Sequence, residues 1–246
     1  MSECLVSDLG GLPMIDDNVK LSAIATLACA VRQGLDQKQQ PLASYLQPEL
    51  ARECYRNACA QLVTELDSVE PTKKDMRIIQ QACDAIVAIV PEWEAHFSIP
   101  LRWRRLITDI LSSSNPIIPQ HIYLGQSGIY GNRLAEQIIH ELSHTWVGMI
   151  AEIVPLALPG EPIHTLPSGT MNKEIRQVVY ALTFSATAVR YYRKRIAVSQ
   201  NYPDDIERLK YLERYTDGCL KIVETSDKLL INGTHMAASC RRILYS

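Results

Sequence analysis

Hydrophobic residues recur along most of this chain with the three- and four-residue spacing of helices rather than the alternation of strands. From Asp17 to Leu35, apolar positions line one helical face, and Pro48 stands where a second helix begins, a favourable place for proline. The same pattern predicts helices over Asp17–Leu35, Pro48–Leu66, Pro71–Val90, Leu101–Leu111, Asn132–Ile153, Asn172–Val198, Asp204–Leu230 and His235–Leu244. The chain is therefore expected to be mainly α-helical.

Strand signals are rare. Only Ile117–Leu124 is rich in β-branched and aromatic residues, and the serine-rich segment before it predicts a loop from Ser112 to Pro116. We expect a single-domain helical fold over residues 1–246, with a minor strand before the helix Asn132–Ile153. Residues 1–115 form the helical N-terminal half, and residues 116–246 form the half with the candidate chemistry.

Composition narrows the function classes. The 246 residues carry a net charge of −2, so nucleic acid is not the expected partner. No apolar run is long enough to span a bilayer, and the N-terminal residues do not resemble a secretion signal. Seven cysteines without a CxxC pair are typical of reduced thiols, which predicts a cytoplasmic protein. None of these features predicts an oligomeric state.

The candidate chemistry lies in the segment from His140 to His144, which is an HExxH motif. Residues four apart stand on one face of a helix, so His140 and His144 can bind the same metal ion. Glu141 is then placed to handle a proton close to that metal. The surrounding apolar residues predict a largely buried helix, in which two histidines and a glutamate are costly unless they are used.

A third metal ligand is needed, because zinc takes three protein ligands plus water, and non-haem iron takes two histidines and a carboxylate. The residue six positions after His144 is Ile150, so no histidine extends the motif. Glu174, at the start of the helix Asn172–Val198, is the preferred ligand. The alternatives are Gln177 one turn later, His164 and His235.

The helix Asn172–Val198 also carries candidates for binding a co-substrate. Arg176 or Arg190, with Tyr180 on the same helix, can hold a carboxylate through the paired donors of a guanidinium. The simpler interpretation is a solvated charged face, since runs of charge usually face water.

From Pro116 to about Tyr192, the chain resembles the bacterial HEXXH-motif peptide-modification proteins. The matching segments are Gln120–Leu124, Leu134–Glu141, the exit Val154-Pro155-Leu156, and Gln177–Leu182 with its Tyr-Ala pair. Some members have a histidine where Gln177 stands. The resemblance implies iron(II)- and 2-oxoglutarate-dependent hydroxylation of the β-carbon of a peptide residue, with iron held by His140 and His144.

Three hypotheses follow. The first is an iron(II)/2-oxoglutarate-dependent oxygenase that hydroxylates a peptide or small amino-acid-like natural-product substrate. The second is a zinc hydrolase of the HExxH type, in which Glu141 is the general base. The third is a helical binding protein without catalysis. The scarcity of predicted strands and a reducing compartment favour the first over the second, because HExxH peptidases usually align their substrate on a mixed sheet.

Overall fold

The computed structural model describes residues 4–58, 66–115, 118–160, 162–198 and 203–246. By its contacts the chain divides into two compact units, one of Leu21–Ile153 and one of Met1–Lys20 together with Val154–Ser246. This division differs from the two halves suggested by the sequence, and the single-domain organisation stays a prediction. No helix among the described residues has the length and apolar character to cross a membrane. The six cysteines in these ranges are free thiols, and Cys59 lies outside them.

The unit Leu21–Ile153 contains four of the eight predicted helices at nearly the predicted positions. The capping box that opens α4 illustrates why, since the Thr72 hydroxyl accepts from the Asp75 amide while the Asp75 carboxylate accepts from the Thr72 amide. The helix predicted to reach Leu66 is α3, described as far as Ala58. The helical elements are α2 (Leu21–Leu35), η1 (Leu42–Leu46), α3 (Pro48–Ala58), α4 (Lys73–Ile89), η2 (Pro91–Phe97), α5 (Gln126–Ile129) and α6 (Leu134–Ile153).

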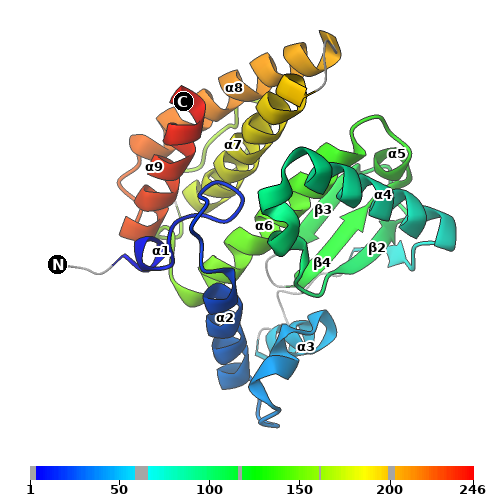
Figure 1. Ribbon diagram of the computed structural model, residues 1–246. Helices are drawn as coiled ribbons and strands as arrows, with labels where there is room; N and C mark the ends of the chain where they lie inside the picture. Colours follow the sequence, from blue (N-terminus) through cyan, green and yellow to red (C-terminus); the bar gives the residue numbers. More distant parts are fainter. Residues whose placement is uncertain (1–3, 59–65, 116–117, 161, 199–202) are drawn as a thin grey trace. The chain divides into compact units, whose positions relative to one another are not determined.

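A four-stranded mixed sheet, visible in Figure 1, forms the centre of this unit. The strands are β1 (Ser68–Val69), β2 (Arg102–Leu106), β3 (Ser112–Asn115) and β4 (Ile118–Leu124), arranged in the order β1-β2-β4-β3. β4 pairs in parallel with β2 and antiparallel with β3, and every residue of β4 is buried. Among the described residues, β3 is therefore an edge strand.

The sheet corrects two predictions. The expected helix Leu101–Leu111 is wrong, because Arg102–Leu106 pairs with β4 as a strand. The expected loop Ser112–Pro116 is also wrong over its described part, which forms β3. The predicted strand Ile117–Leu124 is confirmed as β4, although Pro116 and Ile117 lie outside the described residues. The fold is mainly helical as expected, but it holds a sheet where one minor strand was predicted. Pairing with a buried central strand outweighed local propensity in both corrected segments.

The two faces of the sheet meet different helices. Ser113 pairs with Tyr123, and Arg102 pairs with His121; Glu49 of α3 lies 3.6 Å from Nε2 of His121 on this face. On the opposite face, the Ser112 hydroxyl donates to Gln137 of α6 at 2.7 Å. Helix α6 packs against both β3 and β4, as Figure 1 shows.

Two glycines bring the segment before α6 against the start of β3. The Gly125 amide donates to the Leu111 carbonyl at 2.9 Å. A Cβ at Gly125 would lie 1.9 Å from the Ile110 carbonyl oxygen, and one at Gly128 would lie 2.3 Å from that of Leu111. Only glycine permits these approaches, which keep β3 beside α6.

A buried ion pair connects the first and last helices of the same unit. Arg32 of α2 has no exposed surface and makes two bonds to Glu152 of α6, at 2.7 and 2.8 Å. Arg32 also donates to Gln120 and to the Tyr45 carbonyl, and Tyr55 donates to Glu152 at 2.9 Å. This bidentate network anchors the C-terminal end of α6.

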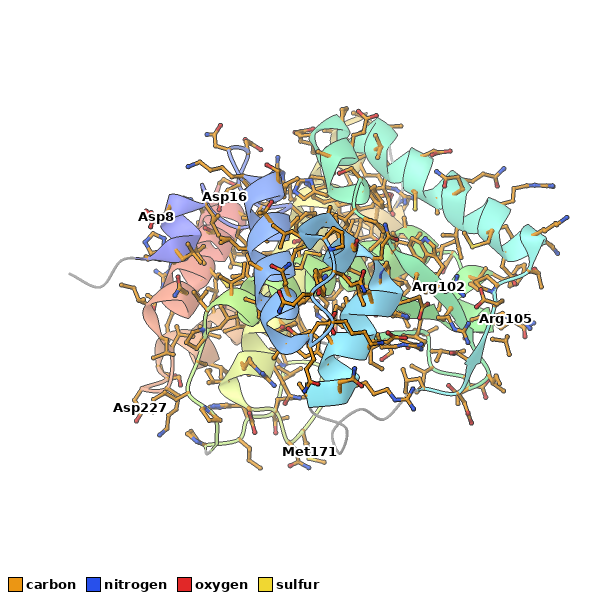
Figure 2. All side chains as sticks on the ribbon, turned by 90° about the horizontal axis from the view of Figure 1, so that it is seen from below. Asp8, Asp16, Arg102, Arg105, Met171 and Asp227 are labelled. Atoms are coloured by element: carbon orange, nitrogen blue, oxygen red, sulfur yellow. The ribbon has the colours of Figure 1, made fainter. Side chains whose placement is uncertain are left out.

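The other unit is helical. Helices α7 (Ile175–Val198), α8 (Pro203–Glu224) and α9 (Ile231–Tyr245) pack together, with the short helix α1 (Leu5–Asp8) against α9. The N-terminal segment belongs to this unit, since Arg242 of α9 donates to Asp16 at 2.8 Å. Figure 2 labels Asp8 and Asp16 on this segment beside α9.

Candidate metal centre

The HExxH residues lie on α6, which is continuous over twenty residues. The helix ends at Ile153, shortly before Pro155, because the residue before a proline disfavours the helical conformation. The His140 and His144 rings stand on one helical face, with centroids 4.4 Å apart and planes at 80°. The predicted burial of this helix is confirmed, since thirteen of its residues are buried. The sequence spacing therefore brings two imidazoles together in the folded chain.

Glu141 points its carboxylate toward both rings. Its Oε1 lies 3.9 Å from Nδ1 of His140, and its Oε2 lies 4.0 Å from Nδ1 of His144. The side chain is only 1% exposed. Burial raises the pKa of Glu141, and the nearby charge of His144 and the hydroxyls of Ser112 and Ser114 offset this in part. A carboxylate with a raised pKa is better suited to accept a proton than an ordinary surface glutamate.

His140 is held in its neutral form. Packing around the ring lowers the pKa of His140 to about 4, against the opposing charge of Glu136 one helical turn earlier, although 30% of the side chain still meets solvent. A neutral imidazole keeps a lone pair on one nitrogen, which is the form that binds a metal.

Strand β3 supplies a further polar group that sequence reasoning missed. The Ser114 hydroxyl lies 3.5 Å from Nδ1 of His144. Its neighbour Ser112 also faces α6, through Gln137. Ser112 and Ser114 are two positions apart, and residues with this spacing lie on the same face of a strand. This signal was not used, because the segment was predicted as a loop.

The two histidines and Glu141 fit part of a divalent metal site. Their chemistry suits zinc or iron(II). Glu141 Oε2 is buried with no well-formed hydrogen bond among the described residues, an arrangement that is costly unless another group uses it. Within the same residues, no cluster of three or more His, Cys, Asp or Glu side chains has the geometry to hold a metal ion.

The remaining predicted ligands belong to the other unit. Glu174 is partly buried and directly precedes α7, where its amide donates to the Gln177 side chain at 3.1 Å. Gln177 thus caps the start of α7. His164 lies on the segment before α7, bridged to Lys173 through the backbone, and His235 is exposed on α9. The role of Glu174 as third ligand stays a prediction.

The predicted co-substrate residues also lie on α7. Arg176 is exposed in the first turn, and Tyr180 is buried with 8% of its surface exposed. Arg190 donates to the carbonyls of Met14 and Ile15 and forms an ion pair with Asp17. These bonds give Arg190 a structural role in holding the N-terminal segment, which sequence reasoning did not foresee. Co-substrate binding by Arg176, Arg190 and Tyr180 stays a prediction.

A cavity of about 240 Å³ lies between α8 and α9. It is lined largely by small and apolar side chains, together with the paired residues Glu224 and Arg241. None of the predicted site residues lines it.

In comparisons with known proteins, no protein-family model matches this chain, and no curated protein sequence matches it either. The resemblance to the HEXXH-motif peptide-modification proteins therefore stays a prediction.

Proposed function

We propose that this protein is a metal-dependent enzyme that acts on a peptide or an amino-acid-like substrate, with iron(II) and 2-oxoglutarate as cofactors. The observation that carries the proposal is the convergence of His140, His144 and the buried Glu141 on one side of α6, next to the edge strand β3. Burying a carboxylate beside two imidazoles costs free energy, and a binding protein without catalysis has no evident need for this arrangement.

The edge strand supports a peptide as substrate. An unpaired strand edge offers a row of backbone donors and acceptors to which an extended peptide can add. Among the described strands, β3 supplies such an edge, and it also carries Ser114, whose hydroxyl lies 3.5 Å from Nδ1 of His144. A peptide paired with β3 would therefore run past the histidines, and this holds for oxidation and for hydrolysis alike.

For the oxygenase, each residue has a defined part. His140 and His144 would hold iron(II), with Glu174 as the third ligand, and the carboxylate of 2-oxoglutarate would pair with Arg176 or Arg190. Iron with 2-oxoglutarate and oxygen supplies the oxidation of an unactivated carbon, and the products are a hydroxylated substrate, succinate and carbon dioxide. Glu141 would hold or move a proton beside the site. This chemistry is supported by the resemblance over Pro116 to Tyr192.

A zinc hydrolase is the second candidate, and the sheet specifically favours it. The scarcity of strands counted against a peptidase in the sequence, but that premise is wrong because β3 and β4 lie beside α6. A zinc ion lowers the pKa of a coordinated water to about 7. Glu141 would accept the proton of that water and deliver it to the departing amine.

The two chemistries separate in one set of measurements. Protein purified without oxygen is analysed for metal and assayed with 2-oxoglutarate and a peptide mixture. We expect bound iron, succinate formation and a peptide mass increase of one oxygen atom. Zinc as the sole metal, with amide cleavage in the absence of oxygen, would establish the hydrolase instead.

Variants identify the residues. His140→Ala and His144→Ala should each abolish metal retention while preserving helical content. Glu141→Gln should reduce hydrolysis by roughly a hundredfold to ten-thousandfold if Glu141 is a general base, and oxidation much less. Glu174→Ala should weaken iron binding. Full metal occupancy in a double histidine variant would reject a metal centre on α6.

A further inference from the structure

Ser114 lies where it can connect two groups of the candidate metal centre. Its hydroxyl oxygen is 3.5 Å from Nδ1 of His144, and the same hydroxyl, together with Ser112, helps to lower the raised pKa of Glu141. Serine carries one donor and two acceptor lone pairs, so a single hydroxyl can accept from an imidazole and donate to a carboxylate at the same time.

The neighbouring serines have different hydrogen-bond or pairing partners. The Ser112 hydroxyl donates its single proton to Gln137 at 2.7 Å. Ser113 pairs with Tyr123, so its side chain belongs to the opposite face of the sheet. The pairing of β3 with β4 shifts register between Ser113 and Asn115, around Ser114. Such irregularities re-aim a side chain, and they are frequent beside active sites.

We propose that Ser114 is a positioning residue that keeps the Nδ1–H tautomer of His144. The inference rests on the proposed metal centre. When Nδ1 of His144 donates to Ser114, the lone pair of that ring is on Nε2, ready for a metal ion. Partners that fix the tautomer and orientation of a ligand histidine typically change metal affinity by 10- to 100-fold.

The test compares Ser114→Ala with two control variants. Ser114→Thr keeps the hydroxyl and suits a strand, and Ser113→Ala removes the same atom from the opposite face of β3. The probe is Co²⁺ alone, added to metal-free protein, with affinity and visible absorption spectrum recorded. Ser114→Ala should weaken Co²⁺ binding by roughly 10- to 100-fold and alter the spectrum. Ser114→Thr should restore both, and Ser113→Ala should match the unmodified protein.

A second measurement needs no metal. Long-range ¹⁵N–¹H NMR of histidine-labelled protein reports which ring nitrogen carries the proton. The His144 signal should show the Nδ1–H tautomer in the unmodified protein and lose that preference in Ser114→Ala. Equal Co²⁺ affinity and equal tautomer populations in Ser114→Ala would overturn the role of Ser114. Failure of the proposed metal centre is distinct, because the unmodified protein itself would then bind no Co²⁺.

Discussion

The buried pair of Arg32 and Glu152 gives the sharpest test of what holds α6 in place. Arg32→Met removes the cation and keeps most of the side-chain length, so the Glu152 carboxylate, which is 6% exposed, loses its charged partner. Gln120 and the Tyr45 carbonyl lose a donor as well. The Tyr55 hydroxyl still donates to Glu152.

The expected loss follows from these contacts. Breaking a buried ion pair by removing one partner costs roughly 3–5 kcal/mol. The two uncharged acceptors would add about 1–3 kcal/mol each if they stayed unpaired, but contributions inside one network are not additive. We therefore expect Arg32→Met to lower the free energy of unfolding by about 4 kcal/mol. For a chain of this size, that corresponds to a decrease in Tm of roughly 8–16 °C.

Urea denaturation followed by circular dichroism measures this change. Arg102→Met is the matched control in the same unit, because Arg102 is 43% exposed and pairs with the exposed Glu70, so it should cost less than about 1 kcal/mol. The double variant Arg32→Met/Glu152→Leu should recover part of the loss, since it leaves no unpaired buried charge. The reasoning is refuted if Arg32→Met costs no more than Arg102→Met.

Three further predictions concern the same unit. Gly125→Ala would drive a methyl group into the Ile110 carbonyl, so it should destabilise the fold and weaken metal binding together, as measured by urea denaturation and Co²⁺ titration. Burial lowers the pKa of His121; the unfolded chain therefore takes up a proton first as pH falls below about 6.5, and stability should fall from there toward the lower folded pKa. His121→Asn should flatten this part of the pH–stability profile, as measured by urea denaturation at a series of pH values. Tyr130→Phe removes a 2.7 Å hydrogen bond to the buried Asp75 carboxylate and should lower the free energy of unfolding by about 1–2 kcal/mol, measured by thermal or urea denaturation. An unchanged free energy of unfolding would indicate that water replaces the phenol.

The local sequence predicted the secondary structure well for elements whose own residues determine their conformation. Helix α6 is readable because twenty residues keep a helical apolar pattern without proline, and its motif spacing alone places His140 next to His144. β4 could be predicted because Ile118, Ile122 and Tyr123 favour a strand. Helix α6 carries the part of the site that could be predicted.

The rest depends on pairing between distant segments. Arg102–Leu106 suits a helix as well as a strand, and only its parallel register with β4 decides the outcome. The serines of β3 have a low strand propensity, and they extend because β4 is beside them. Ser114 was missed for this reason, since its contact with His144 joins positions thirty residues apart. Gln120 has a left-handed φ of 60° inside β4, which no local rule would assign to a buried strand residue.

The division of the chain has a topological consequence. Residues of Met1–Lys20 share a unit with Val154–Ser246, so the unit Leu21–Ile153 is an insertion (the guest) within the sequence of the other unit (the host). The guest begins with α2 and ends with α6, and Arg32 and Glu152 join these helices. Deleting the first twenty residues would thus destabilise the host, because Arg242 would lose its partner Asp16. The guest, which follows directly in sequence, would be affected less. A single proteolytic cut at either junction leaves guest and host covalently joined, and only two cuts release the guest.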